Sequence, residues 1–342
     1  MTVSLRPLGK SIFLFCVLVL LILGFFFAWF ASWRADRIAS LDSGSEIVKT
    51  DRGPMELLVR GEGPAVLVFH GAPGGYDQAI LLGSTFVQDD FHVIAPSRPG
   101  YLRTPLTTGP TPEQQADAMA NLIDRMGLSS VAVLAGSWGA PAAIQFAIRH
   151  PGKVWALVLV SPLTTRFDSG GASQGIEPGR LLLDGLRGDF GSWLFVLASE
   201  RDPRRALSRL LDAENKGVAQ HELLIADVLN DSDQIEWFRS LIGTFTPLSI
   251  RKAGLLNDLA QGRSLPDLPL EQIAAPTLVV HGTADRCVPF AAAEAAARRI
   301  RGALLLPVEG AGHLIEIGPW ASEVQRRIAE FLGQHAGSGS QP

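Results

Sequence analysis

Cysteine is scarce in this sequence and positive charge is dispersed, and both features exclude classes of protein. Cys16 and Cys287 are the only cysteines among 342 residues, which leaves little scope for a disulfide framework. The 30 lysines and arginines do not cluster and are outnumbered by 34 aspartates and glutamates, so nothing indicates a nucleic-acid surface. With 47% hydrophobic and 19% charged residues, the composition predicts a globular protein with an unusually apolar component.

The apolar component is concentrated in one N-terminal run, residues 11–33. This run contains no charged residue and, at more than about 20 residues, is long enough to cross a bilayer as a helix. Trp29 and Trp33 stand where an interfacial aromatic belt would place them. A cleaved signal peptide is the competing interpretation, but its apolar core normally has about 7–15 residues and ends in an Ala-x-Ala-like site. We therefore favour a retained single-pass anchor in a cell membrane.

Basic residues flank both ends of this run, so they give opposing signals about its orientation. Arg6 and Lys10 on the cytoplasmic side would leave the rest of the chain outside the cytoplasm, the usual result for an N-terminal signal-anchor. Arg34 and Arg37 favour the opposite orientation under the positive-inside rule. We expect the large domain to lie outside the cytoplasm.

The remaining chain alternates strand-like and helix-like segments, which predicts an α/β protein with a mostly parallel sheet. Two short alternating runs around a Gly-Pro turn predict an antiparallel hairpin at its start. Six further strand-like runs follow, at residues 65–70, 91–96, 130–134, 154–160, 277–280 and 303–306. Residues 163–273 contain only helix-like blocks, at 179–188, 203–214 and 221–229, and predict a helical cap inserted after the sixth strand.

The sequence therefore predicts seven segments along the chain. They are an N-terminal tail (1–10), a transmembrane anchor (11–33), a linker (34–45), a first core part (46–162), the helical cap (163–273), a second core part (274–335) and a tail (336–342). The two core parts are expected to build one eight-stranded sheet. A helix at 112–127, with Thr111 as its N-cap, and helices at 289–301 and 319–332 are expected to cover that sheet.

The stretch from Leu134 to Ala140, Leu-Ala-Gly-Ser-Trp-Gly-Ala, places Ser137 between a strand-like run and a helix-like segment. A serine at the apex of a tight turn between a strand and a helix is the arrangement that a nucleophile elbow requires. The residues two positions before and after the serine must be small, because the strand end and the helix start nearly touch. They are Ala135 and Gly139, so Ala135 adds one methyl group to the usual glycine pattern.

Three other motifs fall at predicted strand ends, where an open α/β sheet gathers its ligand-binding groups. A glycine-rich turn at residues 70–75 can expose backbone amides to a developing oxyanion, and we name the amides of Ala72 and Trp138 as the donors. Asp285 follows the seventh strand, where it is placed to orient a histidine. His313 follows the last strand in a Gly-Ala-Gly-His loop, whose glycines let the ring approach the sheet edge.

The chain order Ser137, Asp285, His313 is the order of the catalytic triad in the α/β-hydrolase fold. From about residue 46 to residue 332, the chain resembles the α/β-hydrolase superfamily. The resemblance rests on His-Gly-Ala-Pro-Gly (70–74), Ser-Arg-Pro-Gly-Tyr (97–101), Ala-Gly-Ser-Trp-Gly (135–139), His-Gly-Thr-Ala-Asp (281–285) and Gly-His (312–313). It implies Ser137 as nucleophile, His313 as general base and Asp285 as the acid that orients the histidine.

Departures from particular members of the superfamily narrow the chemistry. Epoxide hydrolases and haloalkane dehalogenases carry aspartate at the elbow, so Ser137 disfavours an alkyl-enzyme mechanism. The first and third motifs are similar to those of proline iminopeptidases, which bind the free amine of the substrate with acidic groups of the cap, and no cap carboxylate here is assigned that task. The histidines outside the triad show no metal-ligand spacing, so we expect neither a metal nor a cofactor.

We interpret the sequence as that of a membrane-anchored, cofactor-independent serine hydrolase. It would cleave a small-molecule carboxylic ester, or an amide, through an acyl-enzyme on Ser137, and the anchor favours a lipophilic substrate. An aminopeptidase similar to proline iminopeptidases is the alternative within the enzyme class. The alternative of another class is a hydrolase-like domain that binds a ligand without turnover, against which the retention of all three triad residue types argues.

Overall fold

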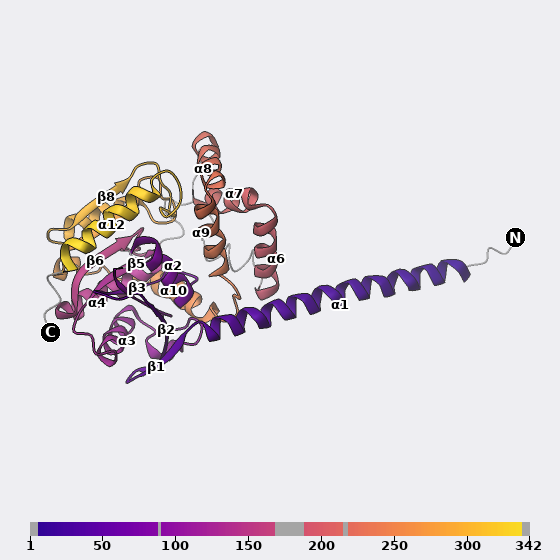
Figure 1. Cartoon of the computed structure of the whole chain (residues 1–342), viewed down its shortest axis with the longest axis horizontal. Coiled ribbons are helices and arrows are strands. Elements are labelled where there is room, and N and C mark those ends of the chain that lie inside the picture. Colours follow the sequence, from indigo (N-terminus) through magenta and orange to yellow (C-terminus); the bar gives the residue numbers. More distant parts are fainter. Residues whose placement is uncertain (1–5, 88–89, 168–187, 215–217, 337–342) are drawn as a thin grey trace. The chain divides into compact units, whose positions relative to one another are not determined.

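An eight-stranded sheet forms the centre of residues 44–342, the larger of the two units into which the chain divides (Figure 1). The computed structural model describes residues 6–87, 90–167, 188–214 and 218–336. The strands are β1 (Glu46–Thr50), β2 (Gly53–Arg60), β3 (Ala65–Phe69), β4 (His92–Pro96), β5 (Val131–Gly136), β6 (Val154–Val160), β7 (Thr277–Gly282) and β8 (Leu304–Val308).

The strands lie in the order β1-β2-β4-β3-β5-β6-β7-β8 across the sheet. The hairpin β1–β2 is antiparallel, and β2 also runs antiparallel to β4. All other neighbours are parallel. The predicted eight-stranded, mostly parallel sheet and its N-terminal hairpin are therefore confirmed.

The central strands are buried on both faces, as their continuous apolar runs require. Along β3, Leu67 and Phe69 belong to one core cluster whereas Val66 and Val68 belong to the other. Helices α3 (Pro112–Arg125), α4 (Ala140–Arg149) and α11 (Phe290–Arg299) contribute to the first cluster. Helices α2 (Tyr76–Phe86) and α12 (Ala321–His335) contribute to the second. Short 3-10 turns lie at Leu106–Thr108, Ser137–Gly139, Pro151–Lys153 and Leu270–Gln272.

Local sequence signals explain α3 but not α2. Thr111 caps α3 by accepting from the backbone amide of Gln114, whose side chain in turn accepts from the Thr111 amide, so the predicted N-cap is confirmed. Helix α2 was not predicted, and Gly83 in its interior weakens the helical pattern. That glycine has a packing reason, because a Cβ there would lie 2.6 Å from Val93 Cγ1.

Five described helices lie between β6 and β7, and they confirm a helical insertion after the sixth strand (Figure 1). They are α6 (Gly188–Arg201), α7 (Pro203–Glu214), α8 (Val218–Asn230), α9 (Ser232–Gly243) and α10 (Lys252–Arg263). The block predicted at 203–214 is α7, and the one at 221–229 falls within α8. The block predicted at 179–188 lies outside the described residues, apart from Gly188, where α6 begins.

The smaller unit, residues 1–43, contains one helix, α1 (Arg6–Ser43). By length and composition it can cross a membrane, with a mean hydropathy of 3.0 over 18 residues, although a signal sequence has the same character. Helix α1 includes residues 6–10 of the predicted tail and residues 34–43 of the predicted linker. Residues 34–43 hold no glycine or proline and several strong helix formers, so the helix continues until it meets Gly44.

Candidate active site

The predicted elbow at Ser137 is a tight turn between β5 and α4. Strand β5 ends at Gly136, Ser137 has a φ of +48°, and a 3-10 turn leads directly into α4. A positive φ costs a residue with a Cβ about 1–3 kcal/mol, so the surroundings must hold it in place. Gly139 allows this, because a Cβ there would lie 2.4 Å from the carbonyl oxygen of Phe69. Ala135 is fully buried in the core, which accommodates its additional methyl group.

The structure brings Ser137, His313 and Asp285 into one hydrogen-bonded chain. His313 Nε2 lies 2.9 Å from Ser137 Oγ, and His313 Nδ1 lies 2.8 Å from Asp285 Oδ2. Asp285 follows β7 and His313 follows β8, and these strands run parallel, so their carboxyl ends meet at one sheet edge. An ionised carboxylate can only accept, so Nδ1 carries the imidazole proton and Nε2 accepts from the serine hydroxyl. This is triad geometry, and the catalytic roles of the three residues stay predictions.

Asp285 occupies a site that favours its ionised form. Its Oδ1 accepts from the backbone amides of Cys287 and Val288 at 2.8 and 2.9 Å, and its Oδ2 lies 2.9 Å from His281 Nε2. Burial alone would raise the pKa of Asp285, but the adjacent His313 and hydrogen bonds from both histidines outweigh burial and hold that pKa well below its usual range. The role of His281 as a second histidine on this carboxylate was not predicted.

Ser161 supports the backbone of His313. It directly follows β6, has a φ of +44°, and donates a hydrogen bond from Oγ to the carbonyl oxygen of His313 at 2.9 Å. This contact joins two segments separated by 152 positions. A serine at the end of an apolar strand has no sequence pattern that indicates a contact with a distant loop. The contact of Ser161 with His313 was therefore not predicted.

The glycine-rich turn after β3 lies beside the elbow. A Cβ built on Gly71 would lie 3.5 Å from the Cβ of Ser137. Ala72 and Trp138, the two predicted amide donors, both pack against one apolar cluster of the insertion, formed by Leu248, Leu255 and Leu259. Trp138 belongs to the 3-10 turn that begins at Ser137, and the first amides of a helix have no partner within it. The structure thus brings both residues near Ser137, and their role as oxyanion donors stays a prediction.

A buried arginine, Arg98, holds the start of this turn. Its Nε donates to the His70 carbonyl oxygen at 2.9 Å and its Nη2 to the Gly71 carbonyl oxygen at 3.2 Å. The same guanidinium makes a two-pronged ion pair with Asp258 of α10, at 2.9 and 2.6 Å. Burial and the charge of Arg98 lower the pKa of His70 well below its usual value, so its neutral ring accepts the Arg98 amide at 3.0 Å.

The insertion supplies further contacts to the second half of the turn. Arg251 donates to the Gly74 carbonyl oxygen at 2.8 Å and pairs with Asp77 at 2.8 Å. Gln78 donates to the Pro73 carbonyl oxygen at 2.7 Å and to Thr244 Oγ1 at 3.1 Å. Side chains therefore hold four backbone carbonyls of this turn, two on either side of Ala72. The motif at 97–101 contains Arg98 but indicates no role for it, and no sequence pattern marks Asp258, Arg251 or Gln78.

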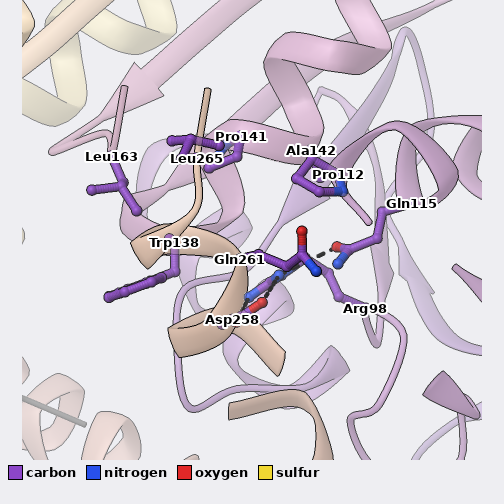
Figure 2. Close-up of a pocket in the computed structure, with 11 residues that line it drawn as sticks. Arg98, Pro112, Gln115, Trp138, Pro141, Ala142, Leu163, Asp258, Gln261 and Leu265 are labelled. Atoms are coloured by element: carbon purple, nitrogen blue, oxygen red, sulfur yellow. Dashed lines mark hydrogen bonds and ion pairs between the residues drawn. The ribbon is translucent and has the colours of Figure 1, made fainter. Parts of the chain in front are cut away.

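Figure 2 shows a pocket beside the Arg98–Asp258 ion pair, where Trp138 and Gln261 also line the wall. The pocket has room for about one water molecule, too little for a substrate. Residues 137, 285 and 313 are not among those that line it. It is a gap where α10 of the insertion meets α3 and α4.

Comparisons with known proteins agree with this fold. The alpha/beta hydrolase fold family matches residues 64–317, and the chain belongs to that family. It is 29% identical over 291 residues to YcgS, an uncharacterized hydrolase of Bacillus subtilis. The aligned region covers 84% of this chain and 98% of the relative. An alpha/beta hydrolase fold protein from Nakamurella multipartita is 34% identical with a TM-score of 0.76, over 86% of this chain and 99% of that one.

A third relative carries a more specific name. A 2-hydroxymuconate semialdehyde hydrolase of Pseudomonas putida is 26% identical over 283 residues, which cover 80% of this chain and 89% of the relative. The predicted superfamily is thereby confirmed, and the chain is an enzyme of the hydrolase class.

The Arg98–Asp258 pair generates a first prediction. The Asp258→Asn substitution removes the charge that compensates a fully buried guanidinium, so it should cost about 3–5 kcal/mol of unfolding free energy. Because Arg98 also holds the carbonyls of His70 and Gly71, ester hydrolysis by the folded fraction should fall by about tenfold or more. Urea unfolding and initial rates on p-nitrophenyl acetate measure the two effects.

Asp267→Asn is the matched control, because Asp267 also pairs with an arginine, Arg299, but is 80% exposed. An exposed pair contributes about 1 kcal/mol or less. If the two variants unfolded at the same urea concentration, the buried pair would not have the role assigned to it.

Glu316 generates a second prediction. Its side chain is buried three residues after His313, and Oε2 has no hydrogen-bond partner within the described part of the chain. Burial raises the pKa of Glu316 from about 4.5 to about 7. The folded state therefore keeps this proton to higher pH than the unfolded chain, and the carboxyl increasingly destabilises the fold as pH rises from about 4.5 through 7.

Glu316→Gln should accordingly leave stability unchanged below about pH 4.5 and raise it by about 3 kcal/mol above pH 7. Urea unfolding at pH 4.5 and pH 8.5 tests this difference. Glu323→Gln serves as the control, since Glu323 is an exposed glutamate paired with Arg326 and should show no such gain at high pH. Parallel pH profiles for wild type and Glu316→Gln would refute the raised pKa.

Proposed function

We propose that the protein is a serine hydrolase that cleaves a carboxylic ester through an acyl-enzyme on Ser137. The observation that carries this proposal is the continuous hydrogen-bonded chain from Ser137 Oγ through His313 to Asp285, at 2.9 and 2.8 Å. A serine hydroxyl is a weak nucleophile unless an adjacent base takes its proton. His313 Nε2 is placed to take it, and Asp285 stabilises the imidazolium that results.

The proposed reaction has two halves. Ser137 Oγ attacks the ester carbonyl while its proton moves to His313 Nε2, and the same proton is then given to the departing alcohol. Water next enters the site, His313 takes one of its protons, and the resulting hydroxide attacks the acyl carbonyl. The acid leaves when the proton returns to Ser137 Oγ. No cofactor is needed for either half.

The oxyanion of each tetrahedral intermediate would accept from the backbone amides of Ala72 and Trp138. The support for this assignment is the position of the glycine-rich turn, whose Gly71 lies beside the Cβ of Ser137. Loss of one such donor typically slows acyl transfer by about 100–1000-fold, so the geometry of the turn matters for rate. The side-chain bonds from Arg98, Gln78 and Arg251 hold that geometry before substrate arrives.

Apolar surroundings favour an ester with an apolar acyl group. Leu248, Leu255 and Leu259 of the insertion pack against Ala72 and Trp138, with Phe195 alongside. The aminopeptidase alternative needs a carboxylate of the insertion to bind an amine. Asp258, which is buried at this junction, already pairs with Arg98 and accepts from Tyr101 Oη at 2.6 Å.

Ser137→Ala provides the direct test. The substitution should abolish labelling by a fluorophosphonate probe and lower hydrolysis of p-nitrophenyl acetate by about a thousandfold or more, because the nucleophile is lost. Ser264→Ala is the matched control at an exposed serine and should match wild type in both assays.

Two results would overturn the proposal. Labelling that persists at another residue would remove Ser137 as the nucleophile, and equal hydrolysis by wild type and Ser137→Ala would favour a binding domain without turnover. A substrate panel of short and long acyl esters, proline arylamides and 2-hydroxymuconate semialdehyde then separates the esterase from the aminopeptidase and from the activity named for the Pseudomonas putida relative.

We also propose that α1 is retained as a single-pass membrane anchor, with the hydrolase unit outside the cytoplasm and a lipophilic substrate reached from the bilayer. The helix has the length and hydropathy for a span, and its apolar side chains are exposed rather than packed in a core. Arg6 and Lys10 would anchor the cytoplasmic end.

Deletion of residues 1–43 should release the enzyme from membranes and lower turnover of long-chain esters in vesicles by about tenfold or more, since each buried CH₂ of a lipid-like substrate favours the bilayer. Turnover of a short water-soluble ester is the internal control and should not change. Unchanged long-chain turnover would contradict the lipophilic substrate, and a mature N-terminus downstream of α1 would contradict the retained anchor.

A further inference from the structure

Cys287 lies next to the proposed triad but is not part of it. One ligand atom from each of Asp285, Cys287 and His313 lies within 4.8 Å of the other two. Asp285 is buried, whereas Cys287 and His313 are partly exposed, so solvent reaches the group. The first two residues follow β7 and the third follows β8, and for this reason no contiguous ligand spacing appears in the sequence.

We propose that Asp285, Cys287 and His313 form a binding site for a soft divalent cation, Zn²⁺ in particular, and that the bound ion inhibits the hydrolase. Thiolate sulfur, imidazole nitrogen and carboxylate oxygen are the ligand types of protein zinc sites. With bonds of about 2.0–2.3 Å, ligand atoms on one tetrahedral ion lie about 3–4 Å apart. Side-chain rotations that move the three atoms by about an ångström therefore complete the set, and water takes the fourth position.

Asp285 can join the ion by exchanging one contact. Its Oδ1 stays bonded to the backbone amides of Cys287 and Val288. Its Oδ2 keeps the contact with His281 Nε2 at 2.9 Å and exchanges the one with His313 Nδ1, at 2.8 Å, for the cation. The carboxylate and the Cys287 thiolate together supply two negative charges that neutralise the ion. Binding releases one proton, from the thiol, into solvent.

Inhibition follows from the position of the imidazole proton. A metal on His313 Nδ1 needs the lone pair of that nitrogen, so the single proton of the neutral ring moves to Nε2. Nε2 then donates to Ser137 Oγ instead of accepting from it, and the serine loses its base. This step rests on the proposed function, whereas occupation of the site by the metal does not.

Zinc inhibition of p-nitrophenyl acetate hydrolysis by the full chain tests the functional half. Wild type and the matched control Cys16→Ala should be inhibited by the same Zn²⁺ concentration, and Cys287→Ala should need at least about tenfold more. The Cys287→Ala variant keeps the backbone amide that Asp285 accepts, and the inhibition of each variant is measured relative to its own activity without zinc. Equal inhibition of Cys287→Ala and wild type would overturn the proposal.

Cadmium titration tests the binding half separately, because thiolate-to-cadmium charge transfer absorbs in the ultraviolet whether or not the enzyme turns over. Cys16→Ala/Ser137→Ala, in which Cys287 is the only thiol, should develop this absorption with one equivalent of Cd²⁺. Adding Cys287→Ala should abolish the absorption. Adding His313→Ala should weaken the affinity for Cd²⁺ at least about tenfold. If His313→Ala left the cadmium absorption unchanged, Cd²⁺ would be bound without the histidine. That result would refute the proposal. Failure of the Ser137 assay alone would leave this measurement intact.

Discussion

The close approach of Gly139 to the end of β3 is the constraint on which the arrangement of the site depends. A Cβ on Gly139 would lie 2.4 Å from the carbonyl oxygen of Phe69 and 2.7 Å from that of His70, so only glycine lets the start of α4 pack on this strand end. The contact puts Ser137 beside the turn that follows β3. Because two rigid elements meet there, their packing helps to hold the positive φ of Ser137.

Buried charge then couples the helical insertion to the same turn. The Arg98–Asp258 pair lies almost wholly out of water, and burying two charges costs about as much as their attraction returns, so the pair is weak evidence for stability. The pair contributes instead to the geometry of the site. One planar guanidinium reaches Asp258 and the carbonyl oxygens of His70 and Gly71 together, which an apolar pair of equal volume cannot do. The position of α10 thus becomes part of the geometry around Ala72.

The sheet, the insertion and the positions of Ser137, Asp285 and His313 at strand ends were predictable because each leaves a local pattern. Continuous apolar runs identify strands buried on both faces, and Ser137, Asp285 and His313 each follow such a run. Contacts between distant segments leave no such pattern. Asp258 lies 160 positions from Arg98, and nothing in the sequence distinguishes it from a charged residue on the solvent-exposed face of a helix. The continuation of α1 through residues 34–43 was not predicted, because the turn-rich stretch at 41–45 suggested a linker, although the arginines, alanines and leucine of this segment favour a helix.

The protonation states at the sheet edge follow from these long-range contacts. Two backbone amides and two histidines keep Asp285 ionised, so it accepts from His313 Nδ1 and leaves Nε2 facing the serine. The tautomer that the proposed base requires is therefore set by one contact, at His313 Nδ1. Any group that takes the lone pair of Nδ1 therefore moves the imidazole proton to Nε2. The neighbouring thiol of Cys287 supplies the soft ligand through which a cation can compete. The proposed base and the proposed cation site thus share the same two loops.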